Sequence, residues 1–246
     1  MGEQLCYVDA YAHSVEARVT ALEDGVGSSL VVLDRTVFYP GGGGQPADRG
    51  TLLRTADGSR WTVVSARKVS GEIGHELESG SEPPAVGDRV TVELDRARRL
   101  ALMRTHTALH ALCGVVWRDY GALVTGGNME PGAGRMDFEF DRMSGDLVGR
   151  IEETVNAELA AARNVRVNLL PRDQAFAIPD LIRTKVNLLP PGIEQIRTIE
   201  IVGLDLQADG GTHVANTREV GGIHVTGYES KGRINKRIRI ELVDPA

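Results

Sequence analysis

The sequence has little cysteine and few aromatic residues. Two cysteines, Cys6 and Cys113, occur in 246 residues, and aromatic residues make up 4% of the chain. Two cysteines cannot form the disulfide framework of a small secreted domain, so we expect both to be reduced. The sequence also lacks an apolar run near the roughly 20 residues that span a bilayer, and no secretory signal is visible at its start. We therefore expect a cytoplasmic protein without membrane contact.

The chain has no excess of positive charge. It carries 28 Lys and Arg against 34 Asp and Glu, a net charge of −6, which taken alone disfavours a polyanionic partner. Net charge does not locate the charges, however, and the basic residues gather in two segments. These are Arg96, Arg98, Arg99 and Arg104, and Lys231, Arg233, Lys236, Arg237 and Arg239. Such segments can neutralise phosphates or can simply form a solvated face, and the sequence leaves both interpretations open.

There is no internal repeat and no low-complexity segment, and the first part of the chain has a β-like pattern. Short alternating runs are separated by turn residues, which predicts a small antiparallel barrel or sandwich. The runs are Val8–Tyr11, Glu16–Ala21, Ser29–Leu33, Trp61–Ala66 and Arg89–Leu94. Near Asp95 the apolar period changes from two to 3.6. We therefore predict a β-barrel-like domain with a glycine-rich loop over residues 1–94 and a second domain over residues 95–246.

The second domain is predicted to be α+β with an antiparallel sheet and two main helices. The first helix covers Asp95–Asp119, with Leu102, Leu109, Cys113 and Val116 in one apolar stripe. The second helix follows the N-cap residue Ser144 and runs to about Arg163. Its apolar residues are Leu147, Ile151, Val155 and Leu159. Strands are expected at Gly134–Phe140, Val165–Leu170, Ile196–Val202, Glu219–Glu229 and Arg237–Val243, with a short helix within Ala175–Thr184.

Two histidines lie four residues apart in the first predicted helix. His106 and His110 therefore share a helix face, where two imidazoles can bind one metal ion. The glutamate that follows the first histidine in zinc proteases is absent, because residue 107 is Thr. The alternative is a pair of core histidines held by hydrogen bonds.

A second cluster, Asp209-Gly210-Gly211-Thr212-His213, contains groups of the same chemistry. Three imidazoles and one oxygen ligand make a zinc site, and a catalytic zinc keeps a position for water, whose pKa it lowers to about 7. Asp209 is then a fourth ligand or a base, or alternatively a turn cap. Gln207 is a weak zinc ligand, so we assign it to substrate contact. Cys113 lies in the apolar stripe, which favours a buried structural cysteine over a ligand. We predict a metal-dependent hydrolase with one Zn²⁺ per chain.

The glycine-rich stretch Gly41–Gly44 is flanked by Phe38-Tyr39-Pro40 and Gln45-Pro46. Consecutive glycines let backbone N–H groups approach a ligand closely. The Lys-Ser/Thr ending of a nucleotide-binding loop is missing, and we find no ATP-binding signature elsewhere. The alternatives are a loop shaped for a ligand and a flexible hairpin.

Four motifs together resemble the alanyl-tRNA editing proteins, the free-standing relatives of the editing domain of alanyl-tRNA synthetase. They are HTALH at 106–110, DGGTHV at 209–214, FYPGGGGQPADRG at 38–50 and GRMDF at 134–138, and the resemblance runs from about Tyr7 to Ile240. It implies a zinc-dependent esterase, of the medium-length form, that acts in trans on alanine tRNA charged with serine, with glycine as a second candidate. Water would attack the ester that joins the amino acid to the tRNA. Neither ATP nor a stable protein partner is expected.

The resemblance also assigns residues. Metal ligands fall on His106, His110, His213 and position 209, where many members have Cys and this chain has Asp209. A Gln of the synthetase domain falls on Gly126, beside Thr125, so that contact is not preserved. Contacts with the tRNA or substrate are implied for Gly42, Gly43, Gly44, Gln45, Lys231 and Arg237. Apart from the resemblance, Thr105 and Thr125 are substrate contacts that could read the serine hydroxyl. We take Thr36 and Gln207 as the first candidates to read the serine hydroxyl, with Asp209 as the third catalytic residue. The rival hypothesis is a tRNA- or RNA-binding module with a structural zinc.

Overall fold

The computed structural model describes residues 2–24, 29–80, 82–184 and 192–245. The chain divides into two compact units, Met1–Ala101 (unit 1) and Leu102–Ala246 (unit 2). The division falls within the first turns of helix α1 (Arg96–Tyr120), a little after the boundary that the change of apolar period predicts.

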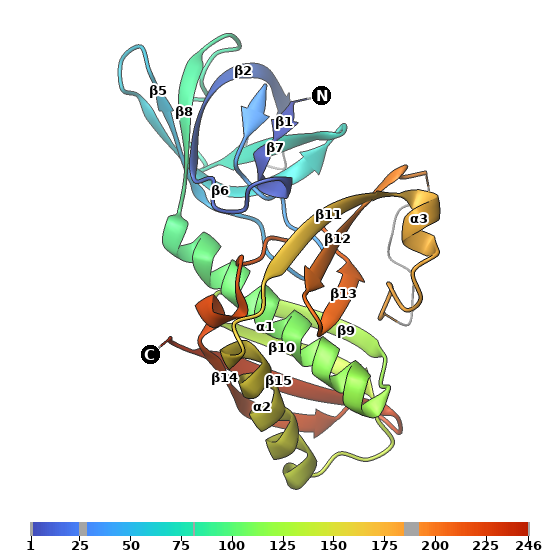
Figure 1. Cartoon of the computed structure of the whole chain (residues 1–246). Helices are drawn as coiled ribbons and strands as arrows, with labels where there is room; N and C mark the ends of the chain where they lie inside the picture. The colour runs from blue at the N-terminus through green and yellow to red at the C-terminus, as the bar shows by residue number, and fades with distance from the viewer. Residues whose placement is uncertain (1, 25–28, 81, 185–191, 246) are drawn as a thin grey trace. The chain divides into compact units, whose positions relative to one another are not determined.

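Unit 1 is built around a closed antiparallel barrel with strand order β2-β3-β7-β6-β5-β8 (Figure 1). Its strands are β2 (Ser14–Asp24), β3 (Ser29–Leu33), β5 (Gly50–Arg54), β6 (Arg60–Val69), β7 (Glu72–Leu77) and β8 (Arg89–Leu94). The barrel closes where Ser14–Arg18 pairs with Arg89–Glu93. Side chains alternate across each strand, so Trp61 and Val63 are buried while Thr62 between them is exposed. A 3₁₀ turn, η1 (Leu5–Tyr7), and a short parallel pair, β1 (Glu3–Gln4) with β4 (Arg35–Thr36), complete the unit.

The strands with the clearest alternation are confirmed. Ser29–Leu33 and Arg89–Leu94 have the predicted bounds, and the other two alternating runs lie inside β2 and β6. The strand predicted at Val8–Tyr11 is wrong: these residues follow η1 in a turn, and Val8 is 80% exposed. Strands β5 and β7 were not predicted, and β7 has glycine and histidine at its centre, which carry little β signal.

Thr36 belongs to a buried hydrogen-bond network inside the barrel. The ring of His75 bonds the carbonyl oxygen of Val31 through Nδ1 (2.8 Å) and the hydroxyl of Thr36 through Nε2 (2.7 Å). Since the carbonyl can only accept, Nδ1 carries the proton and Thr36 donates to Nε2. The hydroxyl oxygen of Thr36 also accepts from the amide of Phe38. Burial lowers the pKa of His75 to about 4, so the ring is neutral at pH 7.

The glycine-rich loop has a defined shape. All four residues Gly41–Gly44 have positive φ, which side chains would oppose. The amides of Gly42 and Gln45 each donate to the other's carbonyl oxygen, and the Tyr39 hydroxyl donates to the Gly42 carbonyl. These bonds support the shaped loop over the flexible hairpin.

Arg99, which the sequence places in a basic segment, is a structural residue of unit 1. Its guanidinium is buried in an ion pair with Asp48 and also donates to the carbonyl oxygens of Ala10 and Val37. Asp48 in turn accepts from the amide of Tyr39. This buried charge therefore fixes loops of unit 1 and does not face a polyanion.

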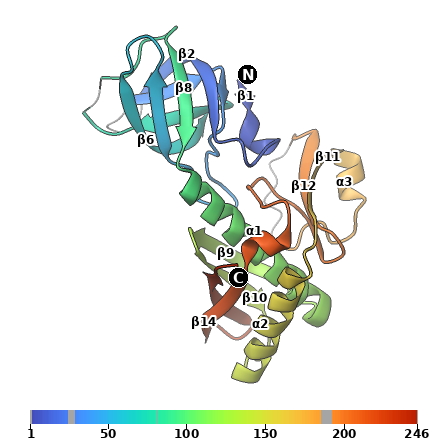
Figure 2. The same ribbon diagram turned by 60° about the vertical axis from the view of Figure 1, so that its left-hand side comes forward.

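The described residues of unit 2 form two antiparallel sheets. One has the order β14-β15-β10-β9 and the other β11-β12-β13. The strands are β9 (Val124–Glu130), β10 (Ala133–Glu139), β11 (Val165–Pro171), β12 (Gln195–Ile201), β13 (Asp205–Ala208), β14 (Gly222–Ser230) and β15 (Asn235–Val243). The helices are α1, α2 (Gly145–Ala160), α3 (Arg172–Phe176) and the 3₁₀ turn η2 (Thr217–Val220). Helices α1 and α2 lie over one face of the four-stranded sheet, as both views show (Figures 1 and 2). The predicted α+β class with antiparallel sheets is confirmed.

Helix α1 is buried on nearly every side from Thr105 to Val116. The predicted apolar stripe is buried, but so is the opposite side, because the helix runs between the two sheets of unit 2 (Figure 1). Its contact with the four-stranded sheet is close: a Cβ at Gly134 of β10 would lie 3.1 Å from Leu109 Cδ1. The side of α1 away from this sheet is the side that carries chemistry.

The observed ends of α2 and α3 can be compared with the helix ends predicted from the sequence. Ser144 caps α2 as predicted, its hydroxyl accepting from the amide of Leu147, although the helix ends at Ala160. The helix predicted within Ala175–Thr184 is wrong, because α3 covers Arg172–Phe176. Pro179 follows three residues after α3, and proline cannot continue a helical hydrogen-bond ladder. In the part of the chain that the structure describes, no helix is long and apolar enough to cross a membrane.

The His75 network predicts a pH dependence of stability. An unfolded histidine has a pKa near 6.5, so between pH 6.5 and 4 the unfolded chain binds more protons than the folded chain. Stabilisation of about 3 kcal/mol, fully present above pH 6.5, should therefore be lost as the pH falls to 4. Urea unfolding can be followed by Trp61 fluorescence in a Trp117→Phe background. The same series in His75→Gln should show a flatter pH dependence, and equal slopes would contradict this account.

Candidate metal centre

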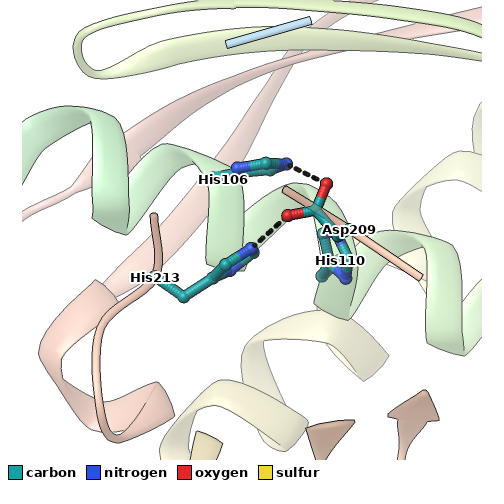
Figure 3. Close-up of side chains that lie close together, drawn as sticks. All are labelled: His106, His110, Asp209 and His213. Carbon is teal, nitrogen blue, oxygen red and sulfur yellow. Dashed lines mark hydrogen bonds and ion pairs between the residues drawn. The ribbon is translucent and has the colours of Figure 1, made fainter. Parts of the chain in front are cut away.

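Four side chains from two segments of unit 2 converge beside helix α1. His106 and His110 stand one turn apart on α1, and Asp209 and His213 come from the loop that follows β13 (Figure 3). The three histidines are buried, and the Asp209 side chain is 12% exposed. The loop thus returns the chain to the helix about a hundred residues later, as the two motifs predicted.

The donor atoms of these four residues all lie within 4.8 Å of one another. The Asp209 carboxylate lies between two rings: Oδ1 is 3.6 Å from Nε2 of His106, and Oδ2 is 3.1 Å from Nε2 of His213 (Figure 3). The His110 ring centroid is 5.1 Å from that of His106 and 4.7 Å from that of His213. Three imidazoles therefore surround one carboxylate.

Burial and mutual charge set the protonation of the cluster. Burial lowers the pKa of His106 well below its usual value and that of His213 to about 4. Burial would raise the pKa of Asp209, but the histidines around it hold that pKa well below the usual range. Burial also opposes a charge on His110, yet its hydrogen bond to Asp205 and the charge of Asp209 raise its pKa. At neutral pH His106 and His213 thus offer lone pairs and Asp209 offers a negative charge, whereas at His110, with its raised pKa, a metal ion competes with a proton.

These residues fit a zinc ion. Zinc favours imidazole nitrogen and accepts carboxylate oxygen, in tetrahedral sites with bonds of about 2.0–2.2 Å, which place donors roughly 3.3–3.6 Å apart. The contacts of Asp209 with His106 and His213 have about this length, and neutral imidazoles with one carboxylate leave a divalent cation only partly neutralised. Small movements of His110 would complete the set.

The ring of His213 is oriented by Thr107 of α1. Its Nδ1 lies 3.1 Å from the Thr107 hydroxyl oxygen, which also accepts from the amide of Val214. With Nδ1 donating to this oxygen, Nε2 keeps its lone pair on the side of Asp209. Thr107 stands where zinc proteases have glutamate, and its role was not predicted from the sequence.

Asp209 has the turn-capping role that was one of its predicted alternatives, and its role as ligand or base stays a prediction. Its Oδ2 accepts from the amide of Gly211 at 2.6 Å, so the carboxylate shapes the turn while it faces the histidines. Arg197 of β12 donates to the Asp209 carbonyl oxygen at 3.0 Å and brings a positive charge 4.0 Å from Oδ2. The sequence did not identify Arg197.

Gln207 lies on β13, two residues before Asp209, and its amide nitrogen is already bonded. Its Nε2 donates to Asp205 at 2.6 Å, and it also hydrogen-bonds Cys113. Burial raises the pKa of the Cys113 thiol, as expected for a structural cysteine. The role of Gln207 in reading a serine hydroxyl stays a prediction.

The other predicted contact residues are distributed over both units. Thr36, Gly42, Gly43, Gly44 and Gln45 belong to unit 1, and their roles stay predictions.

In unit 2, the Thr105 hydroxyl accepts from Gly132 at the β9–β10 turn, and Thr125 donates to Asn235. Lys231 pairs with Glu229, and Arg237 makes two hydrogen bonds to Asp137. Arg104, from the other basic segment, is bound to the Val220 carbonyl and to Asp244. The structure does not bring these unit 2 side chains into the histidine cluster.

Arg237 lies on the face of the four-stranded sheet that α1 and α2 leave open. On β15 the neighbours Lys236 and Ile238 are buried under the helices, so alternation turns Arg237 the other way. Its guanidinium and the Asp137 carboxylate hold each other, and this contact lowers the pKa of Asp137. The positive charge there is partly neutralised.

Comparisons with known proteins place these features in a family. A profile described as "tRNA synthetases class II (A)" matches residues 8–98, and one described as "Threonyl and Alanyl tRNA synthetase second additional domain" matches residues 196–239. The second match contains Asp209 and His213, so half of the metal centre lies in a domain shared with synthetases.

Full-length relatives make the assignment specific. Alanyl-tRNA editing proteins AlaX-M from Methanosarcina barkeri and Saccharolobus solfataricus are 36% and 35% identical to this chain, over 99% and 97% of it and 100% and 98% of their own lengths. An alanine–tRNA ligase from Pyrobaculum neutrophilum is 35% identical over 92% of this chain but only 25% of the ligase. The chain belongs to the AlaX-M family of alanyl-tRNA editing proteins, which confirms the resemblance found in its motifs.

The geometry predicts that His110 is needed for metal binding. Purified protein should contain one zinc per chain, and His110→Ala should lose most of it because only three donors remain. Metal analysis by mass spectrometry after dialysis checks this. His224→Ala is the control, since His224 is an exposed histidine of β14 that pairs with Glu152. Full zinc content in His110→Ala would contradict the ligand set.

A second prediction concerns the unusual residue at position 209. Asp209→Cys should keep zinc or bind it more tightly, because thiolate is a good zinc ligand and the side chain is of similar reach. Asp209→Ala should bind zinc more weakly than either. Loss of zinc in Asp209→Cys would show that the turn made by the carboxylate with Gly211 is required.

Proposed function

We propose that this protein is a trans-editing hydrolase that removes serine from alanine tRNA and uses one zinc ion to do so. The observation that carries the proposal is the convergence of His106, His110, His213 and Asp209 into one buried cluster. Full-length similarity to proteins named as alanyl-tRNA editing proteins supports the substrate class.

The reaction requires the catalyst only to position the reacting groups and to stabilise the charge that develops on the ester. An aminoacyl ester is already labile, so a site needs to orient water and polarise the carbonyl. A bound zinc would supply an acidified water and a Lewis acid. Water attacks the ester carbonyl carbon, the bond from that carbon to the ribose oxygen breaks, and the ribose oxygen takes a proton. In the hydrolase Asp209 stands beside the ion and accepts the proton of the attacking water, whereas in the second candidate below it is the fourth ligand. No ATP is consumed.

Selectivity must come from one hydroxyl group. A site that hydrogen-bonds the serine hydroxyl leaves buried polar groups unpaired when alanine enters, which can give large discrimination. Gln207 donates its amide nitrogen to Asp205, so we assign its carbonyl oxygen as the acceptor for serine. Thr36 is the other candidate, although its hydroxyl is already used by His75 in unit 1. Glycine has no hydroxyl to read and is the second substrate to test.

The tRNA would be held through its phosphates. On unit 2 we assign Lys231, Arg237, Thr105 and Thr125 to contact with the tRNA or substrate, and on unit 1 we assign the loop Gly42–Gln45. The basic side chains are partly neutralised by Glu229 and Asp137, so a modest, salt-sensitive affinity is expected. No stable protein partner is needed.

One observation favours a second candidate. Asp209 can close the site as a fourth ligand, and a zinc with four protein ligands is usually structural. The protein would then be a tRNA-binding module without deacylase activity.

Deacylation assays separate the two candidates. The protein should release serine from Ser-tRNA(Ala) and spare Ala-tRNA(Ala), and a chelator should abolish the release until zinc is restored. His110→Ala should be slower by about a hundredfold or more, because it removes the metal. His224→Ala is the matched control. Tight tRNA binding without release of serine would favour the binding module, and chelator-resistant release would refute the zinc mechanism.

A further inference from the structure

A buried carboxylate that the sequence did not identify lies behind the metal centre. Asp205, the first residue of β13, places Oδ2 at 3.2 Å from Nδ1 of His110. Its side chain is fully buried. Asp205 is not among the four residues that can hold the ion, and it contacts the edge of the His110 ring opposite the nitrogen available to the ion.

The hydrogen bonds of Asp205 are unevenly divided between its two oxygens. Oδ2 accepts from Nε2 of Gln207 at 2.6 Å and faces His110, whereas Oδ1 is buried without a hydrogen-bond partner. The nearest cation, Nη2 of Arg183, is 3.9 Å from Oδ1, and that guanidinium lies over the Trp117 ring. The buried charge therefore has its direct polar contacts on the side of His110.

The backbone is built to bring Asp205 to this position. Gly114 lies one turn beyond His110 on α1, and a Cβ there would come 2.9 Å from Cβ of Asp205 and 3.1 Å from the carbonyl oxygen of Leu204. Only glycine lets the β12–β13 turn approach the helix this closely. His110 and Gly114 thus lie on one helix face. His110 supplies the ring, and Gly114 leaves the space that lets the Asp205 carboxylate reach it.

We propose that Asp205 is a positioning residue for the metal centre. Its carboxylate accepts the Nδ1 proton of His110, which fixes the ring in the tautomer whose Nε2 is unprotonated and directed at the ion. A carboxylate behind a ligating histidine also makes the imidazole a stronger donor. The inference rests on the proposed metal site. There the Thr107 hydroxyl contacts Nδ1 of His213 in the same way that Asp205 contacts Nδ1 of His110.

The test is zinc affinity, measured by competition with a chromogenic chelator. Asp205→Asn keeps the shape and removes the charge, and it should weaken zinc binding by about 10- to 100-fold while one zinc per chain still binds at saturation. Asp137→Asn is the matched control, because Asp137 is also a mostly buried, ion-paired aspartate of unit 2. Unchanged affinity in Asp205→Asn, or an equal loss in Asp137→Asn, would overturn the proposal.

Two further measurements keep the proposal testable if Asp205→Asn does not fold. In the zinc-loaded unmodified protein, long-range ¹⁵N–¹H NMR should show His110 protonated at Nδ1, and a proton on Nε2 would overturn the proposal. Gly114→Ala should push the β12–β13 turn away from α1 and weaken zinc binding in the same direction; wild-type affinity there would overturn it too. These readouts do not use tRNA. An unmodified protein that binds zinc but does not release serine would refute the proposed function and leave the role of Asp205 standing.

Discussion

The candidate metal centre depends on the close packing of the segment from Leu204 to His213 against one face of helix α1. The helix alone supplies two imidazoles, and these become a site only when the β12–β13 turn and the following loop lie against it. Gly114 makes this contact possible, because any side chain there would meet the backbone of Leu204. The opposite side of α1 is held just as closely through Leu109 and Gly134. The helix is therefore held between two sheets, and both of its histidines at the centre are buried.

Placing three imidazoles and two carboxylates in a buried region is costly unless each polar group is satisfied, since an unpaired buried group costs about 1–3 kcal/mol. The centre meets this requirement in layers, except at Oδ1 of Asp205, which is buried without a hydrogen-bond partner. The Asp209 carboxylate bridges two histidines and closes its own turn, while Thr107 and Asp205 satisfy the far sides of His213 and His110. Polar groups that hold the rings in place thus also direct lone pairs toward one point, which is what a zinc ion requires.

Basic and polar side chains are also paired within the protein where the sequence suggested nucleic-acid contacts. Arg99 is buried with Asp48, Arg104 binds the end of unit 2, and Arg237 is held by Asp137. Thr36, which precedes the glycine-rich loop, uses its hydroxyl in a hydrogen bond to His75. Counts of basic and polar residues in a segment therefore overstate what remains for a ligand. An acidic protein can still bind tRNA through such faces, with affinity that depends strongly on salt.

Local periodicity in the sequence was enough to determine the strands with clear alternation, the length of α1 and the cap of α2, because these depend on interactions within a few residues. The spacing of His106 and His110 predicted that they share a helix face. Together with the DGGTH motif and the other motifs, it identified the four residues of the candidate centre and the family. Tertiary structure alone decided the rest. Burial of α1 on both sides depends on sheets formed far along the chain, and strands β5 and β7 are fixed by their barrel neighbours. The partnership of Asp205 with His110 spans 95 residues and needs a glycine at 114, so spacing along the chain could not reveal it.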